Sequence, residues 1–440
     1  MTSPGTPEPV SSNSPLRPSN EGSARLHYGW IMIAVTFMVL LAAAGVRATP
    51  GVMIQPLEKA FGWNTTQISS AISVNLVLYG LIGPFAAALM QTIGVRRVAC
   101  IALVLLASGA LLSLRMTNTF MLTLTWGIMV GVGSGMAALT LGATVANRWF
   151  IAHRGVAMGL MTASSATGQL VFLPLMAALV TAFGWRAAAL TSGIGAVIIL
   201  PLAWCFLRET PASMGLSPIG GHAIVPQPAV KTGGNPFAVA INALREASGH
   251  RGFWLLFFSF FVCGASTNGF IGTHFISMCA DHGISAVHGA SLLAAMGLLD
   301  LVGTTASGWL SDRYDSRRLL FWYYGLRGLS LLYLPFAFGF DFYGLPLFAV
   351  FYGLDWIATV PPTVRLTTDI FGRDKAPIVF GWIVAGHQIG AAFATLAAGM
   401  MRASLGNYQL ATYCSGGLCL ISALVVLRIR ARDQKLASPA

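Results

Sequence analysis

Charged side chains are scarce in this sequence. Asp, Glu, Lys and Arg make up only 9% of its 440 residues, whereas an ordinary soluble domain carries about 25%. Hydrophobic residues make up 55%, and the mean hydropathy is +0.72. So little charge cannot cover the surface of a water-soluble protein of this length. The scarcity of charge therefore excludes a soluble cytosolic enzyme and indicates a membrane protein.

Cysteine is also scarce, and its spacing forms no motif. The six cysteines include no C-x-x-C pair and lie mostly in apolar runs, so we interpret them as small apolar residues rather than disulfide or zinc ligands. The sequence also has no nucleotide-binding loop and no His, Asp or Glu cluster with metal-ligand spacing. We therefore expect no metal, no cofactor and no enzymatic activity.

What the sequence has in abundance is long apolar runs, each long enough to cross a bilayer as a helix of about 20 residues. We predict an all-α polytopic membrane protein with twelve transmembrane helices embedded in the lipid bilayer. The predicted spans are 28–54, 68–92, 97–115, 119–146, 155–180, 185–207, 251–279, 285–310, 317–338, 344–369, 377–402 and 408–429.

One long polar segment, 208–250, divides these spans six and six. It is rich in Gly and Pro and lacks apolar periodicity, so it is predicted to be a cytoplasmic linker between two six-helix bundles, 27–207 and 251–430. Residues 1–26, rich in Ser, Pro, Gly and Asn, are predicted to be a disordered cytoplasmic tail without a cleavable signal, and 431–440 a second cytoplasmic tail.

The distribution of the basic residues predicts the orientation. Lys59, Arg115, Arg186 and Arg402 fall on one side of the predicted spans, and Arg47 and Arg327 fall inside them. The other 20 of the 26 Lys and Arg residues fall on the side that holds both termini. By the positive-inside rule that side is cytoplasmic, in a cell membrane that we expect to be a bacterial inner membrane. The net charge of +12 is thereby explained without nucleic-acid binding.

A loop pattern repeats at matching places in the two halves. Gly83 precedes Arg96 and Arg97 after the second span, and Gly308 precedes a similar loop after the eighth. The repeat indicates two related halves, whose loop arginines and acid are candidates for a gate that pairs across the bundle. The candidate residues of the second loop are Asp312, Arg313, Arg317 and Arg318.

This pattern resembles the signature of the major facilitator superfamily, which implies two six-helix bundles that work by alternating access. The first loop has Gln91 where that family usually has Asp. Three stretches also resemble the monocarboxylate transporter and oxalate–formate antiporter group: 28–30, 147–159 and 297–300. In that group an Arg usually follows the last stretch by one turn, and here Thr304 takes its place.

Few ionisable residues fall inside the predicted spans, where a charge costs several kcal/mol, so these are the functional candidates. Asp300, Asp355, His387 and Arg327 are all predicted near the mid-plane of the second half. We expect Asp300 and Arg327, on neighbouring antiparallel spans, to form a compensated pair. Either the group serves proton coupling, or it is a structural salt bridge beside a hydrogen-bonded histidine.

The remaining intramembrane cation, Arg47, is the candidate anchor for a substrate carboxylate, unless it snorkels to the outer interface. Neutral polar side chains are predicted to complete the binding cavity, although each could equally serve an interhelical hydrogen bond. They are Asn75, Tyr79, Gln169, Asn268 and His274.

Together these features predict a monomeric secondary carrier that moves a small organic anion, with a monocarboxylate as the first candidate, together with a proton. An oxalate–formate type exchanger and a proton-driven drug efflux carrier remain alternatives. Drug efflux fits less well, because Gly127 stands where drug antiporters usually carry an Arg in the fourth span. A membrane enzyme or a sensor without transport is the alternative from another class.

Overall fold

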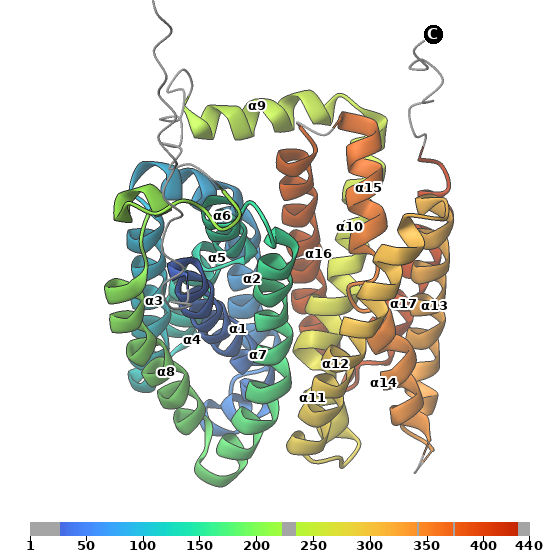
Figure 1. Cartoon of the computed structure of the whole chain (residues 1–440). Helices are drawn as coiled ribbons and strands as arrows, with labels where there is room; N and C mark the ends of the chain where they lie inside the picture. Colours follow the sequence, from blue (N-terminus) through green and yellow to red (C-terminus); the bar gives the residue numbers. More distant parts are fainter. Residues whose placement is uncertain (1–26, 222–234, 341–342, 373–374, 430–440) are drawn as a thin grey trace, which may run out of the picture.

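The computed structural model describes residues 27–221, 235–340, 343–372 and 375–429. These residues form two bundles of long helices that stand side by side, one from each half of the chain (Figure 1). The predicted all-α fold is confirmed. The predicted tails 1–26 and 431–440 lie outside the described residues. The described part of the last bundle ends at Ile429.

Six membrane spans form the first bundle. The fourth of them consists of several short segments, whereas the others are single helices. The segments are α1 (Tyr28–Phe61), α2 (Thr65–Thr92), α3 (Val95–Leu112), α4 (Thr119–Leu122), η2 (Thr123–Met129), α5 (Val130–Met136), α6 (Leu139–Trp149), α7 (Arg154–Phe183) and α8 (Trp185–Phe206).

The second bundle repeats this count of six, with its first and fourth spans divided. Its segments are α10 (Arg251–Gly264), η4 (Ala265–Ile271), α11 (Gly272–Asp281), α12 (Ala286–Ser311), α13 (Ser316–Ala337), α14 (Gly344–Leu354), α15 (Val360–Phe371), α16 (Ala376–Leu405) and α17 (Gln409–Val426).

Nine segments of the described chain are long and apolar enough to cross a membrane by length and composition. Two of the other spans depart from a simple apolar helix: α13 carries Arg317, Arg318 and Arg327, and the tenth span is divided into α14 and α15.

Local sequence explains where the helices begin and bend. Asn64 caps α2. Its side chain accepts the Gln67 backbone N–H at 2.9 Å, and the Gln67 side-chain oxygen accepts the Asn64 backbone N–H. The segments η2 and η4 are π-helical turns inside otherwise α-helical spans, an irregularity that is frequent at functional sites.

The bundles meet along two pairs of helices, α2 with α16 and α7 with α12. Additional contacts join α1 to α11, where the Gln55 side-chain amide lies 3.4 Å from the Ser277 carbonyl and 3.5 Å from Asp281. The Thr66 hydroxyl donates to the Gly399 carbonyl of α16 at 3.3 Å. These polar contacts lie in the C-terminal parts of α1, α11 and α16, at the end of the molecule away from Tyr28.

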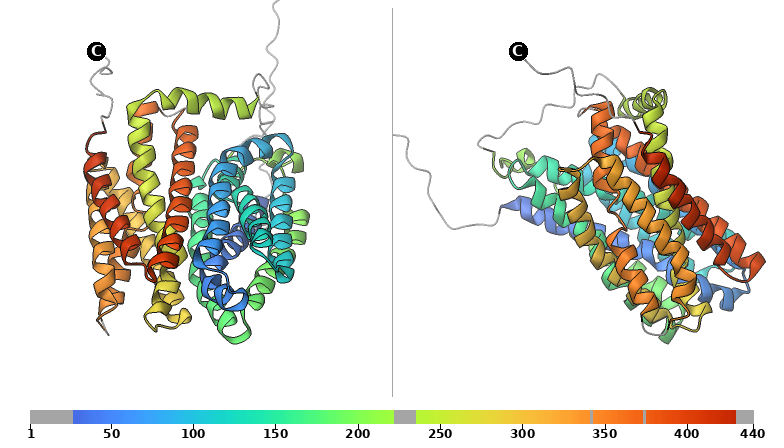
Figure 2. Two further views of the ribbon diagram at one scale, coloured as in Figure 1. Left: turned by 180° about the vertical axis from the view of Figure 1, so that it is seen from behind. Right: turned by 90° about the vertical axis from the view of Figure 1, so that its right-hand side faces the viewer.

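A helix lies within the segment 208–250, which was predicted to be the linker between the bundles. Helix α9 (Pro236–Ser248) lies across one end of the molecule and contacts α2, α10 and α16 (Figures 1 and 2). Trp382 of α16 donates its indole N–H to the Ala240 carbonyl at 2.9 Å, and Phe237 stacks on Phe85 of α2 at 5.4 Å. The linker segment therefore contains a helix that the sequence analysis did not predict. We call this end of the molecule the α9 end.

Two glycines of α12 differ in what surrounds them. Gly308, which precedes the second repeated loop, has no neighbouring atom within 4 Å of an added Cβ, and the same holds for Gly83 of α2. Gly303 is the close-packed position instead, because an added Cβ would overlap the Leu354 carbonyl oxygen.

Replacing Gly303 with alanine is expected to destabilise the protein by roughly 1–3 kcal/mol, because α12 would have to move away from the break after α14. The measurement is the thermal unfolding midpoint of the purified protein in detergent. Gly308→Ala in the same helix is the control and should leave the midpoint unchanged. Equal midpoints for the two variants would contradict the packing described here.

Candidate functional site

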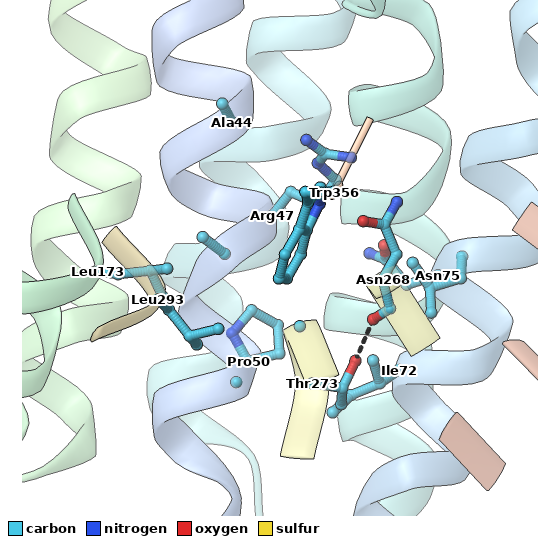
Figure 3. A pocket seen from close by; sticks show the side chains of 14 residues that line it. Ala44, Arg47, Pro50, Ile72, Asn75, Leu173, Asn268, Thr273, Leu293 and Trp356 are labelled. Carbon is cyan, nitrogen blue, oxygen red and sulfur yellow. Dashed lines mark hydrogen bonds between the residues drawn. The ribbon is translucent and has the colours of Figure 1, made fainter. Parts of the chain in front are cut away.

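A cavity lies between the two bundles, about halfway along α1 (Figure 3). Both halves of the chain line it, as a transport site between two moving bundles requires. The lining residues are Ala44, Arg47, Ala48, Pro50, Gly51, Ile72, Asn75, Leu76, Leu173, Asn268, Gly272, Thr273, Leu293 and Trp356.

Arg47 is the one charged residue among these lining residues. Its guanidinium lies over the ring of Tyr79, 4.6 Å from the ring centroid, and no carboxylate of the described chain pairs with it. A narrow space continues past Arg47 and Tyr79 between α1, α2, the end of α5 and the start of α6. An unpaired guanidinium on a cavity wall can bind a carboxylate through two parallel hydrogen bonds.

Two amide side chains lie near Arg47 in the same wall, and both are attached to π-helical turns. Asn75 of α2 donates to the Trp126 carbonyl of η2 at 2.6 Å. Asn268 belongs to η4 itself, and its backbone carbonyl accepts the Thr273 hydroxyl at 2.9 Å (Figure 3). The wider turn of a π-helix leaves carbonyl groups free for such side-chain bonds, and the bond to Trp126 fixes the Asn75 amide beside the cavity.

Trp356 is the cavity residue that the sequence reasoning missed. It lies in the break between α14 and α15, where residues 355–359 leave the helix before Pro361 and Pro362. Its indole packs edge-on against Tyr352 at 5.5 Å. The two prolines were the available signal, because a proline pair cannot continue the hydrogen bonding of a helix and so marks an interruption.

Side chains of α12 and α13 form hydrogen bonds with the backbone N–H and carbonyl groups of this break. Asp300 of α12 accepts the Ile357 backbone N–H at 2.7 Å and the Thr304 hydroxyl at 2.8 Å. Arg327 of α13 donates to the Asp355 and Trp356 carbonyls, and the Ser307 hydroxyl donates to the Ala358 carbonyl at 2.5 Å. Inside a membrane such freed backbone groups need protein partners, so these side chains hold the break in place.

The predicted pairing of Asp300 with Arg327 is wrong. Arg327 binds Asp355 instead, with 2.8 Å between Nε and the carboxylate, and both side chains are buried. The physical reason is that the break turns Asp355 and its carbonyl towards α13, so one guanidinium serves a carboxylate and two carbonyls at once. Asp300 turns to Ile357 and Thr304, the residue that replaces the arginine usual in the monocarboxylate group.

Cys263 also departs from its expected role as a small apolar residue. Its sulfur lies 2.9 Å from Arg327 and 3.2 Å from the Thr359 hydroxyl, so it joins the polar cluster. The His387 ring packs against Phe260 in a tilted arrangement with 5.0 Å between the ring centroids and lies beside Cys263, while its buried Nδ1 has no hydrogen-bond partner. All six cysteines are free.

The buried cluster therefore contains one guanidinium and two carboxylates, and it lies behind Trp356 rather than in the cavity wall. Asp300, Asp355, Arg327 and His387 do not line the cavity. The exposed fraction is 5% for each aspartate and zero for Arg327. Trp356 joins the two regions, since its backbone is bound by Arg327 and its side chain lines the cavity.

Two predicted cavity residues have different outcomes. The placement of His274 in the cavity wall is wrong: it is buried and its ring nitrogens lie 3.1 Å from the Tyr408 hydroxyl and 2.9 Å from the Thr395 carbonyl. The side chain of Gln169 lies outside the described residues. Among the described residues, no three His, Cys, Asp or Glu side chains gather in a metal-binding group.

The second repeated loop forms contacts within its own bundle. Asp312 pairs with Arg365 at 3.6 Å and is exposed, and Arg313 stacks on Trp309 at 4.0 Å. Asp315, which was not a candidate, caps α13 and binds Arg317 at 2.6 Å. This hydrogen bond from Arg317 lowers the pKa of the Asp315 carboxyl. Arg318 is exposed to solvent.

In the first loop the missing acid is supplied from a distant segment. Glu209, just past α8, accepts the backbone N–H groups of Val95 and Arg96 at 2.7 and 3.2 Å and pairs with Arg148 at 3.5 Å. Glu209 thus caps the N-terminus of α3, next to the loop in which this chain has Gln91 in place of the Asp that is usual in the family pattern. Arg96 stacks on Trp204 at 5.0 Å, and Arg97 is exposed.

Two helical bundles around a central, sparsely charged cavity define a membrane transport protein. A sequence model described as Major Facilitator Superfamily matches residues 35–364 and 276–440. The chain belongs to the Major Facilitator Superfamily.

Relatives from animals and bacteria match most of this chain. Monocarboxylate transporter 13 of Bos taurus is 26% identical over 407 residues, which is 91% of this chain and 89% of the relative. Monocarboxylate transporter 11 of Homo sapiens is 24% identical over 433 residues, 96% and 86% of the two chains. The MFS-type transporter YcxA of Bacillus subtilis (strain 168) is 23% identical over 387 residues, 84% and 88%. The chain therefore resembles the monocarboxylate transporter group.

Solved structures share the fold at low sequence identity. A bacterial homologue of the human lysosomal transporter Spinster, in an inward-facing and unoccupied conformation, aligns with a TM-score of 0.74 at 14% identity, covering 93% of this chain and all of that one. A D-xylose–proton symporter aligns with a TM-score of 0.69 at 16% identity, covering 93% and 99%.

Proposed function

We propose that this secondary transporter carries small organic monocarboxylates, by alternating access and together with a proton. The observation that carries the proposal is Arg47, an unpaired guanidinium in the wall of a cavity without any other charged lining residue. A carboxylate that binds there replaces an uncompensated charge by an ion pair in a low dielectric. The resemblance to the monocarboxylate transporters supports the same class of substrate.

The positions of the contacts between the bundles support alternating access. We propose that the α9 end is cytoplasmic, as the basic residues predict. The contacts of Gln55 and Thr66 with the second bundle then lie on the outer side, and they would have to open when the substrate enters from that side.

The charge count of the buried cluster supports a proton site. Asp300 and Asp355 share the single guanidinium of Arg327, with the Cys263 thiol and His387 as further titratable neighbours. If both carboxylates are ionised, one negative charge in a desolvated cluster lacks a partner. A proton removes that charge, and we propose Asp300 as its acceptor because Asp355 already has Arg327.

Uptake by proteoliposomes tests the proposal. The purified protein is reconstituted, and entry of labelled monocarboxylates, dicarboxylates and a neutral amide is measured with and without an imposed pH gradient, acid outside. We expect monocarboxylate uptake that the gradient drives above equilibrium, and none of the amide. Conversion of the substrate without accumulation would instead indicate an enzyme, and extrusion of organic cations a drug carrier.

Asp300→Asn is expected to abolish acceleration by the pH gradient while counterflow of the same acid continues. The asparagine oxygen can still accept from Ile357 and Thr304, so the break is retained and only the protonatable group is lost. Thr304→Val is the control, because it removes a hydrogen bond and keeps the carboxyl. Gradient-driven uptake by Asp300→Asn would contradict the assignment, and gradient-independent counterflow by the unsubstituted protein would identify an exchanger of oxalate–formate type.

A further inference from the structure

We infer that the cavity selects monocarboxylates with an aromatic or similarly flat apolar body and one neutral polar substituent, rather than short aliphatic acids or dicarboxylates. This inference rests on the proposed function and deepens it. It is carried by the arrangement of Trp356, Arg47 and the two asparagines around one cavity.

The cavity wall is rich in bulky apolar side chains. Six of its fourteen lining residues carry one, namely Pro50, Ile72, Leu76, Leu173, Leu293 and Trp356. A two- or three-carbon acid at Arg47 would leave most of this wall without contacts, whereas a ring would bury apolar area against it. The wall therefore favours a substrate with a substantial apolar body.

Trp356 gives this body a preferred shape. Its edge is fixed by Tyr352 and its backbone by Arg327, so the indole is held in one orientation in the cavity. In Figure 3 the indole lies between Leu173 and Leu293 on one side and Asn75 and Asn268 on the other. A fixed aromatic plane of this kind stacks best on a second flat ring.

The polar groups of the wall restrict the number of charges on the substrate. Arg47 can neutralise one carboxylate, and a second one would lie against Thr273 and the two amides without a cation. Asn75 and Asn268 can hydrogen-bond a hydroxyl or carbonyl substituent but cannot compensate a full charge in a low dielectric. The wall thus selects against dicarboxylates.

Uptake of matched probes by proteoliposomes tests this inference. The probes are labelled acetate, phenylacetate, 4-hydroxyphenylacetate and 1,4-phenylenediacetate, compared by kcat/KM. We expect both aromatic monocarboxylates to exceed acetate by roughly 10- to 100-fold, because they bury a ring. We expect 4-hydroxyphenylacetate to be the better of the two and the dicarboxylate to be transported least.

Variants at Trp356 distinguish a lost preference for flat substrates from general damage to the protein. Trp356→Ala should lower kcat/KM for phenylacetate by about 10-fold or more while acetate changes little, and Trp356→Phe should retain most of the activity with phenylacetate. Trp309→Ala, which removes an exposed indole from the outer surface of α12, is the matched control. Thermal unfolding of each variant shows whether it is folded.

The outcomes distinguish this inference from the proposed function. Arg47-dependent uptake in which acetate or the dicarboxylate exceeds phenylacetate would overturn the inference and leave the proposed function in place. An equal loss for acetate and phenylacetate in folded Trp356→Ala would overturn it as well. Absence of Arg47-dependent uptake for every acid would overturn the proposed function itself.

Discussion

Replacing Arg47 with alanine is expected to lower kcat/KM for carboxylate transport by about 100-fold or more, because both charge-assisted hydrogen bonds to the substrate are lost. No other cation lines the described cavity, so no neighbour can take over. A neutral amide analogue, if it is transported at all, should be unaffected. The measurement is initial uptake by proteoliposomes that contain equal amounts of protein.

Two further substitutions show whether the effect belongs to the guanidinium. Arg47→Lys keeps the positive charge but cannot form two parallel bonds, so an intermediate loss of roughly 10-fold is expected. Arg115→Ala removes an exposed arginine at the end of the third span and should leave uptake unchanged. Carboxylate uptake by Arg47→Ala equal to that of the unsubstituted protein would refute the anchor.

The second large effect is expected at Arg327. Arg327→Met leaves the buried Asp355 without a cation and removes the donors for the Asp355 and Trp356 carbonyls. Breaking a buried ion pair by removing one partner costs roughly 3–5 kcal/mol. We expect a strong fall in the thermal unfolding midpoint in detergent, together with loss of transport, because the break no longer holds Trp356 in the cavity wall.

A matched pair elsewhere serves as the control. Arg402 and Asp281 also lie 2.8 Å apart, but their side chains are 27% and 20% exposed, against 0% and 7% for Arg327 and Asp355. Arg402→Met should therefore cost less than about 1 kcal/mol. The double variant Arg327→Met with Asp355→Asn should recover part of the stability, since it removes the unpaired charge as well. Equal unfolding midpoints for Arg327→Met and Arg402→Met would contradict the buried clamp.

The helices followed from the sequence because their causes are local. Apolar runs of sufficient length predicted the spans. The loop repeat predicted the superfamily, which is confirmed, and the stretches around Trp30 and Arg148 predicted a resemblance to its monocarboxylate transporters, which the relatives also show. Helix α9 was missed because its 13 residues are amphipathic rather than uniformly apolar.

The candidate residues were chosen because few ionisable residues fall inside the predicted spans. That criterion does not show which of these residues pair with each other in the folded protein. Every buried charge was identified from the sequence, yet the partner of Arg327 was assigned to the wrong aspartate. The assignment depended on the break after α14, which turns the Asp355 carboxylate and carbonyl to α13. Glu209 was missed for the same reason, because it caps α3 from 114 residues away along the chain.

By itself, the sequence determined the membrane spans, the division into two halves and the small set of charges that a membrane interior tolerates, because length, hydropathy and charge are properties of each segment alone. Only the tertiary structure decided that Arg47 meets the cavity while Asp300, Asp355 and Arg327 are buried behind Trp356. That division depends on the rotation of packed helices and on backbone groups freed at an interrupted span, and neither is encoded in the spacing of residues along one helix.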